Sequence, residues 1–268
     1  MCATCGCAAG GTATLIAAHD HSHDDGHAHD HTHAHGGVHG HEHDVIDATD
    51  PQTLALERAV LAKNDALAGA NRRWFEARGI VALNLVSSPG SGKTSLLERT
   101  IRDLHADVPM LVIEGDQATE NDAARIRAAG ARALQVNTGT GCHLEAEIVR
   151  RALDVLEPAG GSVVMIENVG NLVCPALFDL GEWAKVALLS VTEGDDKPAK
   201  YPYLFAAADL LIITKPDLLP YVDFDIAACI AHARAVRPGL EVIALSARTG
   251  ENVADWYRWI RDARAVPV

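Results

Sequence analysis

Basic residues are scarce in this chain, and residues 1–50 contain no lysine or arginine at all. The 268 residues carry 36 acidic and 23 basic side chains, and eight of the acids lie in those first fifty positions. No basic cluster stands out elsewhere, although such a cluster is the usual footprint of a nucleic-acid-binding protein. The sequence therefore argues against nucleic acid as a partner.

Long apolar runs are missing as well. No stretch approaches the ~18 apolar residues that a membrane-spanning helix needs. The segment Ala13–Ala18 has no basic residue before it and is too short for the core of a signal peptide. We therefore expect a cytoplasmic protein without membrane association, in which all six cysteines stay reduced and available as metal ligands.

Residues 1–50 have the composition of a metal-binding tail. Cys2, Cys5 and Cys7 place three thiols close together, and thiolates are soft ligands that suit Zn²⁺ or Ni²⁺. Redox motifs also use Cys-x-x-Cys, but no strand–helix–strand pattern surrounds this one. Eleven of the fourteen histidines lie in His19–His43, a tract with too little apolar content for a core. We expect this tract to be disordered and to store metal ions, a purification tag being the alternative interpretation.

Helical and strand patterns alternate from Pro51 onward, so we predict one domain over residues 51–268. An amphipathic helix is expected over about 51–77, with Asp50 as its N-cap and Gly79 ending it. Seven short apolar runs follow, several of them continuous, which is typical of strands covered on both faces. We predict an α/β, doubly wound, mostly parallel sheet that binds ligands beyond the carboxyl ends of its strands. The predicted strands are Ile80–Val86, Met110–Ile113, Ala133–Val136, Val163–Ile166, Val186–Val191, Leu210–Thr214 and Val242–Leu245.

Residues 87–94 read Ser-Ser-Pro-Gly-Ser-Gly-Lys-Thr and lie between the first strand and a helix. Glycines here let backbone N–H groups approach phosphate oxygens, and the helix N-terminus adds a favourable dipole. Lys93 is expected to reach the β- and γ-phosphates, and Thr94 to give its hydroxyl to Mg²⁺. Position 87 is Ser where the usual pattern begins with Gly. The predicted phosphate-binding residues of this P-loop are Gly90, Ser91, Gly92, Lys93, Thr94 and Ser95.

Two further strand ends carry acidic residues suited to phosphoryl transfer. Asp116 follows the second strand and is placed to hold Mg²⁺ or to orient an attacking water. Glu167 follows the fourth strand, with Gly170 three residues later. In GTPases this spacing couples a carboxylate on the Mg²⁺ side to a backbone N–H that senses the γ-phosphate. We therefore predict Lys93, Thr94, Asp116 and Glu167 as the catalytic residues.

The last two strand ends suit a guanine base. After the sixth strand, Lys215 would lie along the base plane, and the Asp217 carboxylate can accept both guanine N1–H and N2–H. The standard motif has Asn where this chain has Thr214. Ser246 and Ala247 follow the seventh strand, where their backbone suits guanine O6. A single acid at a strand end is often only a helix cap, but four such motifs in this order favour a guanine nucleotide.

A second candidate metal site lies inside the domain. Cys142 and His143 are adjacent, and Cys174 lies four residues beyond Gly170. Buried cysteine often serves only as a small hydrophobe, which is our interpretation of Cys229. Cys174 differs because nucleotide hydrolysis would move a ligand placed beside the γ-phosphate sensor.

Residues 51–268, with the Cys2, Cys5 and Cys7 start, resemble the hydrogenase nickel-incorporation GTPases, a metallochaperone branch of the P-loop GTPases. The resemblance covers about four-fifths of the chain, and its segment Glu167–Pro175 is specific. The related urease-maturation GTPases share the nucleotide-binding motifs, but we do not expect this cysteine start or the Cys174 block in them. The matching segments are Ser87–Thr94, Ile113–Gln117, Gly141–Leu144, Ile166–Pro175, Val191–Pro198 and Lys215–Tyr221.

The resemblance implies a homodimer favoured by GTP, slow hydrolysis of GTP to GDP, and work with other hydrogenase maturation proteins. It implies delivery of Ni²⁺ to the large subunit of a nickel–iron hydrogenase. It also implies two sites for nickel or zinc, one formed by Cys2, Cys5 and Cys7 and the other by Cys142, His143 and Cys174.

Three alternatives remain open from the sequence. The chain could be a nickel or zinc storage protein with a secondary nucleotidase domain, or a urease-type maturation GTPase. It could also be a P-loop kinase that uses Mg²⁺–ATP, although no arginine-rich lid is obvious and Asp217 would then lack a purpose.

Overall fold

The computed structural model describes residues 51–116, 121–139 and 141–265. The predicted metal-binding tail, with Cys2, Cys5, Cys7 and the histidine tract, lies outside the described residues, so those expectations stay predictions. The described part begins with helix α1 (Pro51–Glu76), close to the bounds predicted from its amphipathic pattern. After α1, Gly79 adopts a left-handed conformation with φ of 59° and turns the chain into the sheet. No helix in the described part is both long and apolar enough to cross a membrane.

Seven parallel strands form one sheet in the order β3-β2-β4-β1-β5-β6-β7. All seven predicted strands and the doubly wound α/β class are confirmed, and the largest differences from the predicted bounds are in the second and fifth strands. The second strand continues to Asp116, which is therefore its last residue. The fifth begins at Ala184 rather than Val186. The strands are β1 (Val81–Ser87), β2 (Met110–Asp116), β3 (Arg132–Asn137), β4 (Val163–Glu167), β5 (Ala184–Ser190), β6 (Leu210–Thr214) and β7 (Glu241–Leu245).

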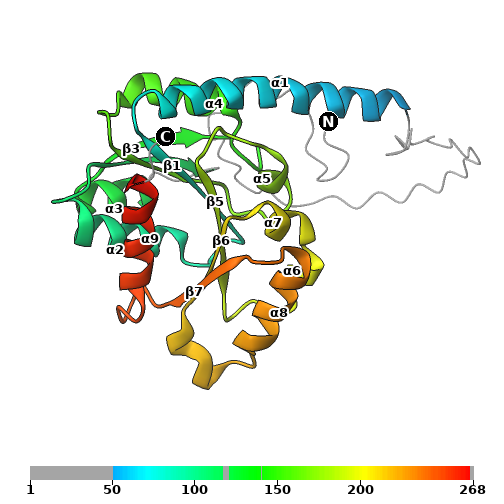
Figure 1. The fold of residues 1–268 in the computed structure, drawn as a ribbon, viewed down its shortest axis with the longest axis vertical. Coiled ribbons are helices and arrows are strands. Elements are labelled where there is room, and N and C mark those ends of the chain that lie inside the picture. Colours follow the sequence, from blue (N-terminus) through cyan, green and yellow to red (C-terminus); the bar gives the residue numbers. More distant parts are fainter. Residues whose placement is uncertain (1–50, 117–120, 140, 266–268) are drawn as a thin grey trace, which may run out of the picture.

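Helices cover both faces of the sheet (Figure 1). One face packs against α2 (Lys93–Leu104), α3 (Asn121–Ala129) and α9 (Val253–Ala265) in a single hydrophobic cluster that includes the fully buried Trp256. The other face carries two separate clusters. One lies under α1 and α4 (Ala146–Leu156), and the other lies under α5 (Cys174–Leu177), α7 (Pro202–Ala207) and α8 (Ile226–Val236). Short helices α6 (Lys197–Lys200) and η1 (Pro216–Tyr221) complete the described elements.

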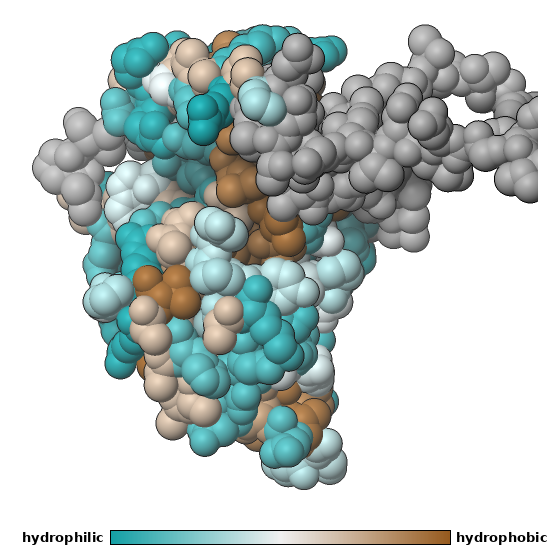
Figure 2. Space-filling model, turned by 90° about the vertical axis from the view of Figure 1, so that its right-hand side faces the viewer, coloured by the Kyte–Doolittle hydropathy of each residue, from teal (hydrophilic) through white to brown (hydrophobic). Residues whose placement is uncertain are grey.

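The outer surface differs from these interiors. On the face shown in Figure 2, hydrophilic residues predominate, and hydrophobic residues gather in a band below the upper part of the molecule.

Cys229 belongs to the interior, because it is fully buried in the hydrophobic cluster beneath α8. Burial raises the pKa of the Cys229 thiol to about 12. The structure therefore confirms the interpretation of Cys229 as a core residue.

Helix α1 holds two loops in place through buried amides. The Asn71 side chain donates to the carbonyls of Ala146 and Leu180, at 2.8 and 3.0 Å. Asn64 accepts a hydrogen bond from the Ala146 N–H and donates to the Asp179 carbonyl. These bonds connect α1 to the start of α4 and to the loop after α5, and both segments adjoin the sites described next.

Candidate functional site

A pocket of about 550 Å³ opens at the carboxyl ends of β1, β2 and β4. The predicted glycine-rich loop forms its floor. Gly90 and Gly92 have φ values of 74° and 98°, a left-handed conformation that residues with a Cβ rarely adopt. The predicted loop residues that line the pocket are Gly90, Ser91, Gly92, Lys93, Thr94 and Ser95.

Lys93 starts α2 and is only 8% exposed. Its Nζ donates to the Ser87 hydroxyl at 2.7 Å, and the Ser91 hydroxyl donates to the same oxygen. The serine at position 87, where the usual pattern has glycine, thus helps to orient the lysine. Burial lowers the pKa of Lys93, while the nearby Glu167 charge opposes that shift. No carboxylate of the described residues forms an ion pair with this buried ammonium, which is therefore well suited to receive phosphate oxygens.

Two carboxylates lie close to the hydroxyl of Thr94, the predicted Mg²⁺ ligand. The Thr94 hydroxyl donates to Glu167 at 2.8 Å and lies 3.2 Å from an Asp122 carboxylate oxygen. Glu167 is 5% exposed, and its Oε2 atom makes no hydrogen bond within the described residues. Burial raises the pKa of Glu167 to about 7, a cost that a bound cation would offset. A hydroxyl and two carboxylates fit the preference of Mg²⁺ for oxygen ligands.

The pocket wall above the loop is the segment that follows β4. Gly170 lies against Pro89 so closely that a Cβ there would come within 2.9 Å of Pro89 Cγ and 3.0 Å of its Cα. The predicted γ-phosphate sensor therefore touches the phosphate-binding loop, and only glycine permits this approach. Asp116 ends β2 beside Gly115, which lines the pocket.

A second cavity of about 490 Å³ adjoins the first, with Gly92, Ser95 and Lys215 lining both. Asp217, Ser246 and Ala247 line it together, as the predicted base site requires. The Asp217 carboxylate accepts from the Ser246 hydroxyl at 2.6 Å and from the Arg248 guanidinium at 3.0 Å. The Ser246 hydrogen bond, more than the guanidinium, holds the pKa of Asp217 below its usual range.

Two residues connect this predicted base site to the glycine-rich loop. Lys215 has a left-handed backbone with φ of 60°, and its Nζ donates to the Gly90 carbonyl at 2.7 Å. The Thr214 hydroxyl is buried and donates to the Ser91 carbonyl at 2.6 Å. The departure from Asn at position 214 therefore leaves a side chain that still fastens the loop.

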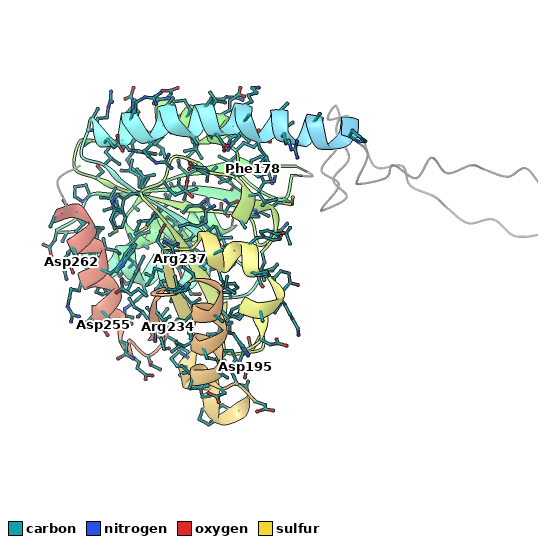
Figure 3. The ribbon with its side chains drawn as sticks, turned by 45° about the vertical axis from the view of Figure 1, so that its right-hand side comes forward. Phe178, Asp195, Arg234, Arg237, Asp255 and Asp262 are labelled. Carbon is teal, nitrogen blue, oxygen red and sulfur yellow. The ribbon has the colours of Figure 1, made fainter. Side chains whose placement is uncertain are left out.

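The three predicted metal ligands of the domain lie together. Their ligand atoms, from Cys142, His143 and Cys174, lie within 4.8 Å of one another. Cys174 is 1% exposed at the start of α5. His143 stacks on Phe178, with 3.9 Å between ring centroids, and Figure 3 places Phe178 beneath α1. Burial lowers the pKa of His143, which favours the neutral imidazole that metals bind.

Sequence reasoning missed three residues of this region. Asp122 and Arg125 line the nucleotide pocket from α3, where an acid in a first helical turn is usually a partner of the helix dipole. Asn168 lines the same pocket, and its Oδ1 accepts from the backbone N–H of Leu144, next to His143. The adjacency of Asn168 to Glu167 was the one available signal.

Comparisons with known proteins agree with this geometry. Residues 81–244 match the family described as CobW/HypB/UreG, nucleotide-binding domain. The chain is 59% identical over 212 residues to the hydrogenase maturation factor HypB of Rhizobium leguminosarum bv. viciae, covering 79% of this chain and 71% of that protein. It is 60% identical over 211 residues to HypB of Azotobacter vinelandii, covering 79% of this chain and 70% of that protein.

A solved structure extends the likeness to three dimensions. The crystal structure of HypB from Helicobacter pylori in complex with nickel aligns with a TM-score of 0.72 and 36% identity, covering 76% of this chain and 95% of that chain. The resemblance predicted from the sequence is thus confirmed. The chain belongs to the HypB hydrogenase maturation factors, within the CobW/HypB/UreG family of nucleotide-binding proteins.

Proposed function

We propose that this protein is a GTP-hydrolysing nickel metallochaperone that delivers Ni²⁺ during maturation of a nickel–iron hydrogenase. The observation that carries the proposal is the path of residues 167–174. This one segment contains Glu167 beside Thr94, Gly170 against the phosphate-binding loop, and Cys174 in the metal cluster. A change at the γ-phosphate therefore reaches a metal ligand through four residues of backbone.

The roles of the pocket residues follow from their positions. Lys93 neutralises the β- and γ-phosphates, and Thr94, Glu167 and Asp122 would hold Mg²⁺, which offsets phosphate charge when bound. Asp116, at the end of β2, stays a predicted ligand of the same ion. Asp217 accepts the guanine N–H groups, while Ser246 and Ala247 face the O6 edge. Gly170 follows the γ-phosphate and carries Asn171–Pro175 with it. The metal cluster closes in the GTP state and opens after hydrolysis, which releases its cargo.

The wider roles belong to the same proposal. We propose that GTP favours a homodimer, that Cys142, His143 and Cys174 bind nickel or zinc, and that Cys2, Cys5 and Cys7 form a second site. The hydrogenase large subunit and other maturation proteins are the expected partners.

The first test of this proposal measures the Ni²⁺ affinity of the full chain with GTP, with GDP and with ATP. Equal affinities in all three states would contradict the metallochaperone and favour metal storage.

Replacing Asp217 with alanine should reduce the affinity for GTP by about 10- to 100-fold and leave that for ATP nearly unchanged. The reason is that a hydrogen bond to a charged group contributes about 1.5–3 kcal/mol, and adenine offers no N–H pair to this carboxylate. Isothermal titration with both nucleotides measures the ratio. Asp255→Asn is the control, because Asp255 pairs with Arg258 on the surface of α9. A variant that loses both nucleotides equally would refute the base assignment.

Gly170→Ala should slow GTP hydrolysis by about 10- to 100-fold, because a ~1 Å displacement can cost about 100-fold. The added Cβ pushes the sensor segment away from Pro89, because the atoms it meets are a ring carbon and backbone. Steady-state kinetics should show the loss mainly in kcat. Gly69→Ala is the matched control, since a Cβ there meets nothing closer than 3.6 Å. Unchanged kcat in the Gly170 variant would separate this contact from catalysis.

A further inference from the structure

Four buried polar side chains lie on or next to the central strands β1, β4 and β5, between the two hydrophobic clusters on the α1 and α5 side of the sheet. They are Asn84 on β1, Asn168 after β4, Glu182 before β5 and Lys185 on β5, and none is more than 7% exposed. The nucleotide pocket uses only Asn168. Buried polar groups are costly unless they are bonded, so their partners need to be accounted for.

One end of this network holds the loop that carries two metal ligands. Asn168 Oδ1 accepts from the Leu144 N–H at 3.0 Å, immediately after His143. The other side of the same amide donates to Asn84 Oδ1 at 3.2 Å. Asn84 in turn donates from Nδ2 to Glu182 Oε1 at 3.0 Å. The bonds therefore run without a break from the Cys142–His143 loop to Glu182.

The other end holds the helix that carries the third ligand. Lys185 Nζ lies 3.7 Å from Glu182 Oε1 and donates to the carbonyls of Pro175, Ala176 and Phe178, at 3.0, 3.2 and 3.3 Å. These carbonyls belong to α5 and the residue after it, so one ammonium fixes the short helix that Cys174 begins. Four residues are too few for a helix to be stable by itself.

A buried lysine–glutamate pair is a poor way to gain stability. The cost of removing both charges from water often exceeds their attraction, and apolar residues of similar volume would serve the core as well. The pair lies on and just before β5, outside the nucleotide pocket, and its lysine restrains the backbone of the helix that begins with Cys174. Its position therefore indicates a role in placing the ligands.

We propose that Asn84, Glu182 and Lys185, together with Asn168, are positioning residues of the metal site. They hold the Cys142–His143 loop and the Cys174 helix in one fixed relation. The inference rests on the proposed nickel function of that cluster. Replacing Lys185, and so removing its hydrogen bonds to the Cys174 helix, should weaken Ni²⁺ binding by about 10- to 100-fold. This is the usual cost of losing the groups that orient metal ligands.

The test uses the full chain with Cys2, Cys5 and Cys7 changed to alanine, so that thiolate-to-Ni²⁺ charge-transfer absorption reports the cluster and not the tail. Ni²⁺ alone is the probe. The variants are Lys185→Met, Glu182→Gln, and the double variant Glu182→Gln/Lys185→Met, which leaves no unpaired buried charge. Lys63→Met is the matched control, because Lys63 is exposed and its ion pair is with Glu147, at 3.7 Å.

We expect the double variant to fold, to bind GTP within about twofold of the parent, and to show both the affinity loss and an altered charge-transfer band. Glu182→Gln should show a smaller loss, because Lys185 keeps its three carbonyls. If Lys185→Met fails to fold, the Ni²⁺ affinity of the double variant, which has no unpaired buried charge, tests the inference. A folded double variant with the parent's Ni²⁺ affinity and spectrum would overturn the inference alone. If the parent protein binds no Ni²⁺ through thiolates, the result would instead contradict the proposed nickel function.

Discussion

Replacing Cys174 with alanine is expected to abolish Ni²⁺ binding at the Cys142–His143–Cys174 cluster and to remove the effect of GTP on metal affinity. The thiol is one of three predicted ligands whose atoms lie within 4.8 Å of one another. Losing a ligand should cost more than the about 100-fold that losing a ligand's hydrogen-bond partner costs. Because Cys174 follows the γ-phosphate sensor, its loss should also uncouple nucleotide from metal. Charge-transfer absorption and equilibrium dialysis with GTP or GDP measure both effects.

Cys229→Ala is the matched control for this experiment. Cys229 is equally buried, but it packs in the core beneath α8, and its thiol pKa is raised to about 12. Its replacement should change folding stability and leave metal binding alone. The coupling idea fails if the Cys174 variant retains the metal stoichiometry of the domain, or if GTP still shifts the affinity of what remains.

Lys93→Ala is expected to weaken GTP binding by about 100-fold or more. Two charge-assisted hydrogen bonds to phosphate are lost, each worth about 1.5–3 kcal/mol, and 1.4 kcal/mol corresponds to a factor of ten. Without nucleotide the variant should be no less stable than the parent, because burial lowers the pKa of this lysine and the alanine removes that cost. Thermal melting with and without Mg²⁺–GTP measures the difference, since bound ligand stabilises by mass action.

Lys63→Ala controls for the loss of a positive charge, since Lys63 is exposed on α1. It should retain the full nucleotide-induced rise in Tm. A Lys93 variant with a parental rise in Tm would mean that the phosphates bind elsewhere, whereas one that melts early without nucleotide would show that the lysine contributes to the fold.

Much of the fold was predictable because buried parallel strands produce continuous apolar runs. Leu210–Thr214 was predicted with the bounds that β6 has. The start of β5 was missed for a physical reason. Lys185 interrupts the apolar pattern, yet it points inward, where backbone carbonyls satisfy it. Periodicity cannot distinguish a buried, bonded lysine from an exposed one.

The parts of the site that are formed by contiguous residues could be predicted from the sequence. Contacts between residues from different helices and strands could not. The glycine-rich loop and the Asp217 motif are each contiguous, so residue type and spacing sufficed. Asp122 reaches Thr94 from a different helix, and this contact depends on packing between α2 and α3. The connection from Asn168 to Glu182 crosses strands that are distant in sequence. Such bonds follow from the strand order, which no local pattern encodes.

The strand order also sets when each site comes into existence during translation. Strand β1 pairs with β4 and β5, which begin about 80 and 100 residues later in the chain. At roughly 5–20 residues per second, the ribosome takes about 5–20 s to supply both neighbours. Cys174 leaves the ribosome within that interval, and Lys185, which fixes its helix, arrives with β5. The predicted ligands Cys142, His143 and Cys174, with the Lys185 that fixes the helix of the last one, are therefore all supplied by the time β5 has been made. Lys215 and Thr214, which fasten the phosphate-binding loop, and Asp217 and Ser246 of the predicted base site follow later in the chain.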